Sequence, residues 1–264
     1  MSLICEKEFT ISITPGFPTP IAWWKMEEAG LADRIDSIGG VPMFASDNDP
    51  NSFITDSSGI ILQGANFETV SALFTDSSAS LHTDFEPSLA YSGDGFSTCV
   101  WFRWNSYDGA SPGTQSMWNW FSSGNGFSIG TSIQWNKATG NLRFGCSMNV
   151  PPYQFPYIFV PFVPTLGTWY LFQASYEIDL INLISTFRVQ INGDAVIEES
   201  MAEGLGLVST PGTAGFVNLT ANGGSSPNKN INLTVDECGI FNLTLSQEER
   251  DFIYNSGAGR TFPP

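Results

Sequence analysis

The sequence predicts an all-β fold of two stacked antiparallel sheets with one short helix near the C-terminus. Short alternating or apolar runs recur along the chain between turn residues, with 26 Gly and 16 Pro among 264 residues. The length suits one sandwich domain, because such domains run to roughly 200–250 residues. Helix signals are confined to residues 246–255, where Ser246 and Glu249 form a capping box and Gly257 follows as a stop.

The chain begins with a prefix, residues 1–20, which we expect to be a short strand and a Pro-rich connector. Residues 8–14 alternate polar and apolar side chains, and Pro15, Pro18 and Pro20 follow. The start lacks the basic and apolar regions of a signal peptide, and the longest apolar runs are too short to span a bilayer. Residues 21–264 are expected to form a single domain.

The strands of that domain are predicted in order. Residues 21–28 form an aromatic opening strand that ends in Glu27 and Glu28, and a turn follows at residues 36–40. Residues 96–102 and 169–176 are apolar enough for buried strands. Residues 187–191 form another, which ends in the hairpin pair Asn192-Gly193. The last strand, residues 235–241, leads into the helix.

This order of motifs resembles the laminin-G-like jelly rolls of the concanavalin A-like lectin/glucanase superfamily. The resemblance rests on the opening strand and its DSxG-type turn, the strand with Trp169, the Asn-Gly hairpin and the closing strand, corner and helix. It covers about residues 21–257 and implies a two-sheet antiparallel jelly-roll sandwich. The superfamily contains lectins, adhesion modules, glycosidases and virion proteins, so the function has to be argued from the site.

Composition excludes several kinds of chemistry. The formal net charge is −16, and the ten Lys and Arg are scattered, which argues against nucleic acid and anionic membrane partners. The four cysteines are too sparse for a disulfide scaffold, and we expect Cys99 and Cys238 to be buried free thiols. His82 is the only histidine, which argues against a zinc site or a His-based triad.

Catalysis is not predicted. Glycosidases of this superfamily carry alternating carboxylates on one strand, where two acids can act as nucleophile and acid. Glu177 and Asp179 match the first half of that pattern, but Ile181 and Asn182 stand where the second acid is needed. We interpret both acids as residues of a solvated turn.

The resemblance also implies a structural Ca²⁺ site. The first and last strands of such a jelly roll pair, which would bring Glu27 near Asp236, and Ca²⁺ prefers six to eight oxygen ligands. Asp236 is the first candidate ligand and Glu27 the second. The alternative is that Asp236 and Glu237 cap or pair at the surface.

Aromatic residues suggest two binding surfaces. Trp118, Trp120 and Trp135 could stack on glycan rings, although core filling is the favoured interpretation in a chain with eight Trp and 21 Phe. Residues 149–165 are an extra segment with five prolines, and an uncharged apolar segment of this kind is typical of a protein interface. Its aromatic residues are Tyr153, Phe155, Tyr157, Phe159 and Phe162. Phe9 and Ile11 of the prefix could add to the sheet edge of a neighbour.

These observations favour a non-catalytic structural and recognition module. We predict a virion-surface protein, either a capsid decoration or a fibre or receptor-binding component, that contacts other proteins of an oligomeric assembly and cell-surface glycan. The alternatives are a secreted carbohydrate-binding or adhesion module and, less favoured, a degenerate glycoside hydrolase.

Overall fold

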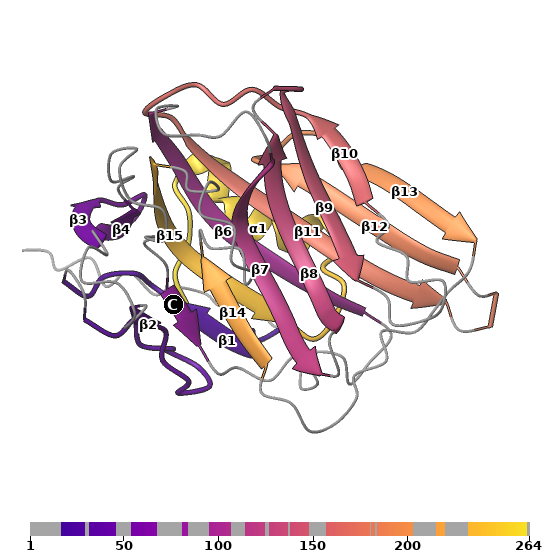
Figure 1. Cartoon of the computed structure of the whole chain (residues 1–264), viewed down its shortest axis with the longest axis horizontal. Coiled ribbons are helices and arrows are strands. Elements are labelled where there is room, and N and C mark those ends of the chain that lie inside the picture. Colours follow the sequence, from indigo (N-terminus) through magenta and orange to yellow (C-terminus); the bar gives the residue numbers. More distant parts are fainter. Residues whose placement is uncertain are drawn as a thin grey trace, which may run out of the picture.

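The structure is a computed structural model. It describes residues 17–29, 32–45, 54–67, 81–83, 95–106, 114–124, 127–136, 138–147, 157–179, 181–182, 184–202, 215–219 and 232–262. Within these ranges two antiparallel sheets stack as a sandwich, with one α-helix near the C-terminus (Figure 1). This confirms the predicted all-β class. The helix found in the described residues is too short to cross a membrane.

The larger sheet has eight strands, and its long central members come from the motifs that the sequence singled out. In spatial order they are β13 (Ile197–Ala202), β12 (Ile184–Ile191), β11 (Trp169–Asp179), β6 (Gly95–Ser106), β15 (Asn232–Phe241), β4 (Gln63–Phe67) and β3 (Ile54–Ser58). The short opening strand β1 (Ala22–Trp24) pairs with β15, placing Trp23 opposite Gly239. The predicted pairing of the first and last strands is therefore confirmed.

The second sheet has seven strands. Its order is β10 (Tyr157–Pro161), β9 (Asn141–Ser147), β8 (Phe127–Asn136), β7 (Thr114–Gly124), β14 (Gly215–Leu219), β5 (Leu81–Thr83) and β2 (Phe44–Ala45). β10 is thus an edge strand in the described part of the chain, and it lies beside β12 and β13 of the larger sheet (Figure 1).

The main core fills the space between the sheets. Along β6 the side chains alternate between faces, so Val100 and Phe102 point to this core while Trp101 points away from it. Phe144 of β9 contacts Phe187 of β12 across the interior, with ring centroids 6.1 Å apart. Aromatic packing of this kind joins the two sheets.

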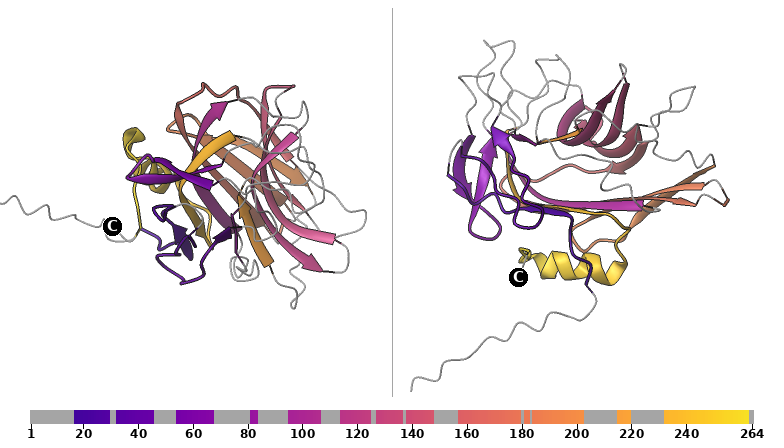
Figure 2. Two further views of the ribbon diagram at one scale, coloured as in Figure 1. Left: turned by 60° about the vertical axis from the view of Figure 1, so that its left-hand side comes forward. Right: turned by 90° about the horizontal axis from the view of Figure 1, so that it is seen from below.

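A second apolar cluster covers the outer face of the larger sheet. Trp23, Trp101 and Phe241 of the sheet pack there against Ile253 of helix α1 (Gln247–Tyr254). Figure 2 shows α1 on the side of this sheet that faces away from β8, β9 and β10. Gly239 permits the close approach of the Trp23 ring to β15, since a Cβ at position 239 would lie 2.2 Å from that ring.

Local motifs have the predicted form. The capping box is present, with the Glu249 amide donating to the Ser246 hydroxyl at 3.3 Å and the Ser246 amide donating to Glu249 at 2.6 Å. The helix ends at Asn255, which has a left-handed backbone, and a single 3-10 turn, η2 (Asn255–Gly257), ends at the predicted glycine stop. Cys99 and Cys238 are buried and form no disulfide, as predicted.

Packing of the domain begins before residue 21. Phe17 contacts three aromatic rings, with centroid distances of 6.3 Å to Phe241, 4.6 Å to Phe252 and 5.3 Å to Phe262. The last residues of the predicted connector therefore belong to the folded body. Phe9 and Ile11 lie outside the described residues.

Candidate functional site

Asp236 and Glu237 lie at an irregularity in β15. The pairing register with β6 shifts between Asp236 and Gly239, and Glu237 has a positive φ of 43°. A bulge of this kind bends the strand and redirects its side chains. Both carboxyl groups are fully buried, so the alternative that they cap or pair at the surface is wrong.

Each buried acid holds a different part of the chain. Asp236 Oδ2 accepts the backbone amides of Ile60 at 2.7 Å and Ile61 at 3.1 Å, which fixes the loop between β3 and β4. Glu237 Oε2 accepts the indole N–H of Trp23. These acids therefore tie the β3–β4 loop and the opening strand to the last strand.

Burial raises the pKa of both carboxyl groups above the usual range. Desolvation raises the pKa of Asp236 to about 7, although the amides of Ile61 and Ile60 oppose the rise. Desolvation also raises the pKa of Glu237 to about 8, with a further contribution from the nearby charge of Asp236. Perturbed acids often mark functional sites. Here they lie beneath packed chain, which favours a structural role.

The surroundings of Asp236 do not resemble a calcium site. Its oxygens accept three backbone N–H groups, the third from Glu237 at 2.9 Å, and N–H groups compete with a cation for the same lone pairs. In the described part of the chain no cluster of three acidic, histidine or cysteine side chains is arranged for a metal. Glu27 is close enough to Asp236 to raise its pKa. Calcium at Asp236 and Glu27 stays a prediction, which calorimetric titration with CaCl₂ would test.

The glycosidase-like acids lie at the end of β11 and have structural partners. Glu177 forms an ion pair with Arg188 of β12. Asp179 accepts the backbone amides of Ile181 and Asn182, both at 2.9 Å, and these bonds lower its pKa. The interpretation of both acids as turn residues is wrong, because Glu177 and Asp179 are paired residues of β11 and the turn begins after Asp179.

The three candidate glycan-binding tryptophans are not equivalent. Trp135 is only 2% exposed, and its indole N–H donates to the Phe162 carbonyl at 3.0 Å. Trp135 is therefore a core residue with no open face for a sugar, as the core-filling interpretation requires. Trp118 and Trp120 lie in β7, and their side chains are outside the described structure.

The predicted protein interface is partly described. Phe159 of β10 is 56% exposed, and Val163 and Leu166 beyond it are 72% and 44% exposed. Tyr157 lies beside Phe159 with ring centroids 6.3 Å apart. We call Tyr157, Phe159, Val163 and Leu166 the β10 surface.

Phe162 belongs to the core instead. Its ring packs at 5.7 Å from Trp104 and 5.0 Å from Tyr170 (centroid distances), because Phe162 continues the alternation of β10, in which Ile158 and Val160 are buried. Phe162 also helps to line a groove of about 190 Å³ between β10 and the β12–β13 edge. Tyr153 and Phe155 lie outside the described residues.

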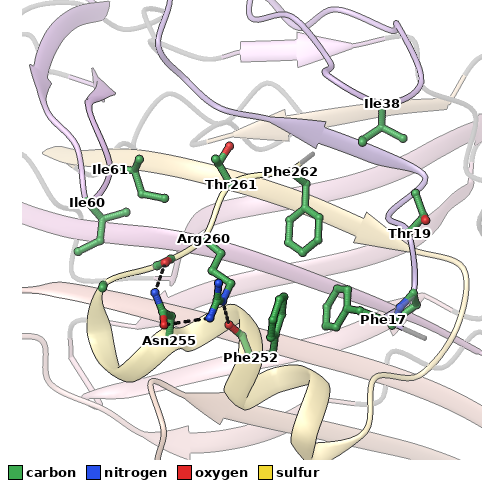
Figure 3. Close-up of a pocket in the computed structure, with 13 residues that line it drawn as sticks. Phe17, Thr19, Ile38, Ile60, Ile61, Phe252, Asn255, Arg260, Thr261 and Phe262 are labelled. Carbon is green, nitrogen blue, oxygen red and sulfur yellow. Dashed lines mark hydrogen bonds between the residues drawn. The ribbon is translucent and has the colours of Figure 1, made fainter. Parts of the chain in front are cut away.

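Sequence reasoning missed a larger pocket on the outer face, which we call the C-terminal pocket. It has a volume of about 620 Å³ and lies between the entry segment, the β3–β4 loop and the chain after α1 (Figure 3). Its main apolar lining residues are Phe17, Ile38, Ile60, Ile61, Phe252 and Phe262. These residues come from four distant parts of the sequence, so no local motif signals the pocket.

Comparisons with known proteins give the fold and no family. No protein-family model matches this chain, and no curated protein matches it. Similar solved structures include the binding domain of botulinum neurotoxin serotype G, at 11% identity and a TM-score of 0.61, which covers 89% of this chain and 50% of that chain. The serotype D ligand binding domain in complex with N-acetylneuraminic acid is similar at 11% identity and a TM-score of 0.59, over 89% of this chain and 50% of that chain.

A sialidase of Trypanosoma rangeli, in complex with a difluorosialic acid, is similar at 11% identity and a TM-score of 0.56. It covers 92% of this chain and 34% of the sialidase. This chain therefore spans about half the length of the neurotoxin structures and about a third of the sialidase. Identities this low establish a shared β-sandwich fold and leave the function open.

Proposed function

We propose that this protein is a non-catalytic recognition module that binds a protein partner through the β10 surface. The observation that carries the proposal is the concentration of large exposed apolar side chains on one edge of the sandwich. Phe159, Val163 and Leu166 follow one another closely along the chain and remain open to solvent. Contiguous exposed apolar surface is typical of protein–protein contact.

The geometry of this edge suits an extended partner segment. β10 ends the order of the seven-stranded sheet in the described residues, and edge strands offer unpaired backbone groups to another chain. The adjacent groove, lined by Val160, Val189 and Ile197, has room for an apolar side chain of that partner. Main-chain pairing supplies affinity and the groove supplies selectivity.

The acids support a role without bond cleavage. Glu177 forms an ion pair with Arg188, and Asp179 accepts backbone amides of the turn that follows it. Asp236 and Glu237 are buried beneath the β3–β4 loop and the C-terminal segment. More specifically, we propose that the protein is a virion-surface component of an oligomeric assembly. A secreted adhesion module is the alternative setting.

Photocrosslinking tests the protein interface. We would place p-benzoylphenylalanine at Phe159 and, as a matched control, at Ile181, which is 93% exposed on the β11–β12 turn. Irradiation of the native assembly is expected to join a protein to position 159 and none to position 181. Crosslinks from neither position, or from both equally, would contradict the proposal.

Glycan binding is the second candidate. It is favoured by two of the similar structures, which were determined in complex with sialic acid ligands. Titration with sialyllactose by calorimetry is expected to show saturable binding that Trp118→Ala or Trp120→Ala weakens. A titration that shows no binding would exclude glycan binding as the function. It would not affect the proposal of a protein interface.

A further inference from the structure

We propose that the C-terminal pocket binds a small amphipathic monocarboxylate, with an apolar body in the pocket and its anionic head on Arg260. The inference does not depend on the proposed function, because the pocket lies on the outer face of the larger sheet and shares no lining residue with the β10 surface.

The pocket has the size and lining of a small-molecule site. Its volume of about 620 Å³ falls within the usual ~300–1,000 Å³ of ligand pockets. One wall is aromatic, since Phe17 packs against both Phe252 and Phe262. Ile60 and Ile61 form the opposite wall (Figure 3). Filling this space with an apolar body removes both walls from water, which contributes roughly 25 cal/mol for each Å² buried.

The walls are held in place before any ligand arrives. The backbone amides of Ile60 and Ile61 are fixed on the buried Asp236 carboxyl. Phe262 is fixed through its carbonyl, which accepts the Ser37 hydroxyl at 2.5 Å. A preformed pocket favours binding because little ordering remains to be done.

Arg260 supplies the anion-binding group. Its Nε donates to the Phe252 carbonyl at 2.7 Å and its Nη2 to the Asn255 side chain at 3.2 Å. Its guanidinium carbon lies 4.0 Å from the centre of the Phe252 ring. Figure 3 shows Arg260 between the isoleucine and phenylalanine walls. The two hydrogen bonds use two of the five guanidinium N–H groups and fix its plane, so the others are oriented for a carboxylate.

The charge of the lining specifies the ligand class. Among the described residues that line the pocket, Arg260 is the only charged one. A single carboxylate therefore balances it, whereas an ammonium head meets a like charge. A neutral head would forgo the stronger charge-assisted hydrogen bond.

Calorimetry with three probes of equal chain length tests the proposal. The full-length protein is expected to bind octanoate saturably, to bind octanol more weakly and to show no binding of octylammonium. Arg260→Gln should weaken octanoate by about tenfold or more, since a hydrogen bond to a charged group contributes roughly 1.5–3 kcal/mol. The same substitution should change octanol affinity less than about twofold, because octanol carries no charge.

Two further variants keep the test decisive. Arg143→Gln is the matched control, because Arg143 also lies over an aromatic ring, that of Tyr157, but outside the pocket. It should leave octanoate binding unchanged. Ile61→Trp should fill the pocket and abolish binding of octanoate and octanol together, while its backbone amide can still donate to Asp236.

Three results would overturn the proposal. The first is equal affinity for octanoate in the native protein and Arg260→Gln, with an unchanged urea midpoint showing that the variant is folded. The second is no binding of octanoate by the native protein. The third is binding only after removal of residues 1–14, which would assign the pocket to the N-terminal part of the chain itself.

Discussion

The two faces of the eight-stranded sheet are packed in different ways. The inner face meets the second sheet through apolar side chains such as Phe102, Tyr176 and Phe187. The outer face meets α1 and the C-terminal segment. It combines the apolar cluster around Trp101 with the buried acids Asp236 and Glu237 and with an open pocket.

This difference shows how one sheet can form the core with one face and a ligand pocket with the other. A face that meets another sheet is extended and regular, so side chains interdigitate and leave little room. A face covered by a single short helix is only partly filled, and loops and chain ends close the remainder. Polar anchors and cavities therefore collect on the outer face, and the candidate ligand pocket is found there.

The largest expected effect compares a phenylalanine on each face. Phe187→Ala removes a fully buried ring from the inner core and should lower the free energy of unfolding by about 3–5 kcal/mol. Phe252→Ala removes a half-buried ring beside the pocket and should cost about 1–2 kcal/mol, since the open pocket already lacks part of its packing. Urea denaturation measures both. Equal losses would show that the two faces are packed alike.

A pH-dependent effect is expected from the outer face alone. The pKa of Glu237 is raised from 4.5 to about 8 in the folded protein, so the folded state holds a proton that the unfolded state releases. The stabilisation from this proton is complete below pH 4.5 and is lost as the pH rises through about 8. Glu237→Gln cannot ionise, so its free energy of unfolding should rise relative to that of the native protein by about 4 kcal/mol between pH 5 and pH 8.5.

Urea midpoints at several pH values measure this difference. The exposed Glu248→Gln on α1 is the control, and its curve should run parallel to that of the native protein. A Glu237→Gln curve that also runs parallel would mean that this carboxyl ionises alike in the folded and unfolded chain.

The smallest effect is expected at the start of the helix that covers the outer face. Ser246→Ala removes the side-chain acceptor of the Glu249 amide and should cost about 1 kcal/mol. Gln247→Ala, at the exposed neighbouring position, should change stability by less than about 0.5 kcal/mol. A Ser246→Ala protein as stable as the native one would show that packing of Ile253 alone holds the helix.

Part of this structure could be predicted from local sequence. The capping box at Ser246 and the turn after Asn192 depend on residues a few positions apart, and both are present as predicted. Apolar runs also identified the central strands β6, β11 and β15 correctly. A turn was expected at Glu177 and Asp179, but both acids lie in β11 and the turn begins only after Asp179.

The remaining errors concern side chains whose surroundings come from elsewhere in the chain. Phe162 follows the edge strand β10, and its ring packs against Trp104 and Tyr170. For Trp135, by contrast, the favoured interpretation of core filling is correct, since the strand places this side chain on the inner face. Composition cannot distinguish an aromatic residue in the core from one at an interface, because both require the same apolar side chain.

The sequence by itself determined the β-rich class, the strand that ends the sandwich and the helix that follows, because hydrogen bonding and alternation within a few residues specify them. Only the tertiary structure decided that Asp236 and Glu237 are buried and that Arg260 lies between two apolar walls. Those outcomes depend on contacts between segments up to about 200 residues apart, such as that between Trp23 and Glu237, and burial is a property of all the segments that meet at one place.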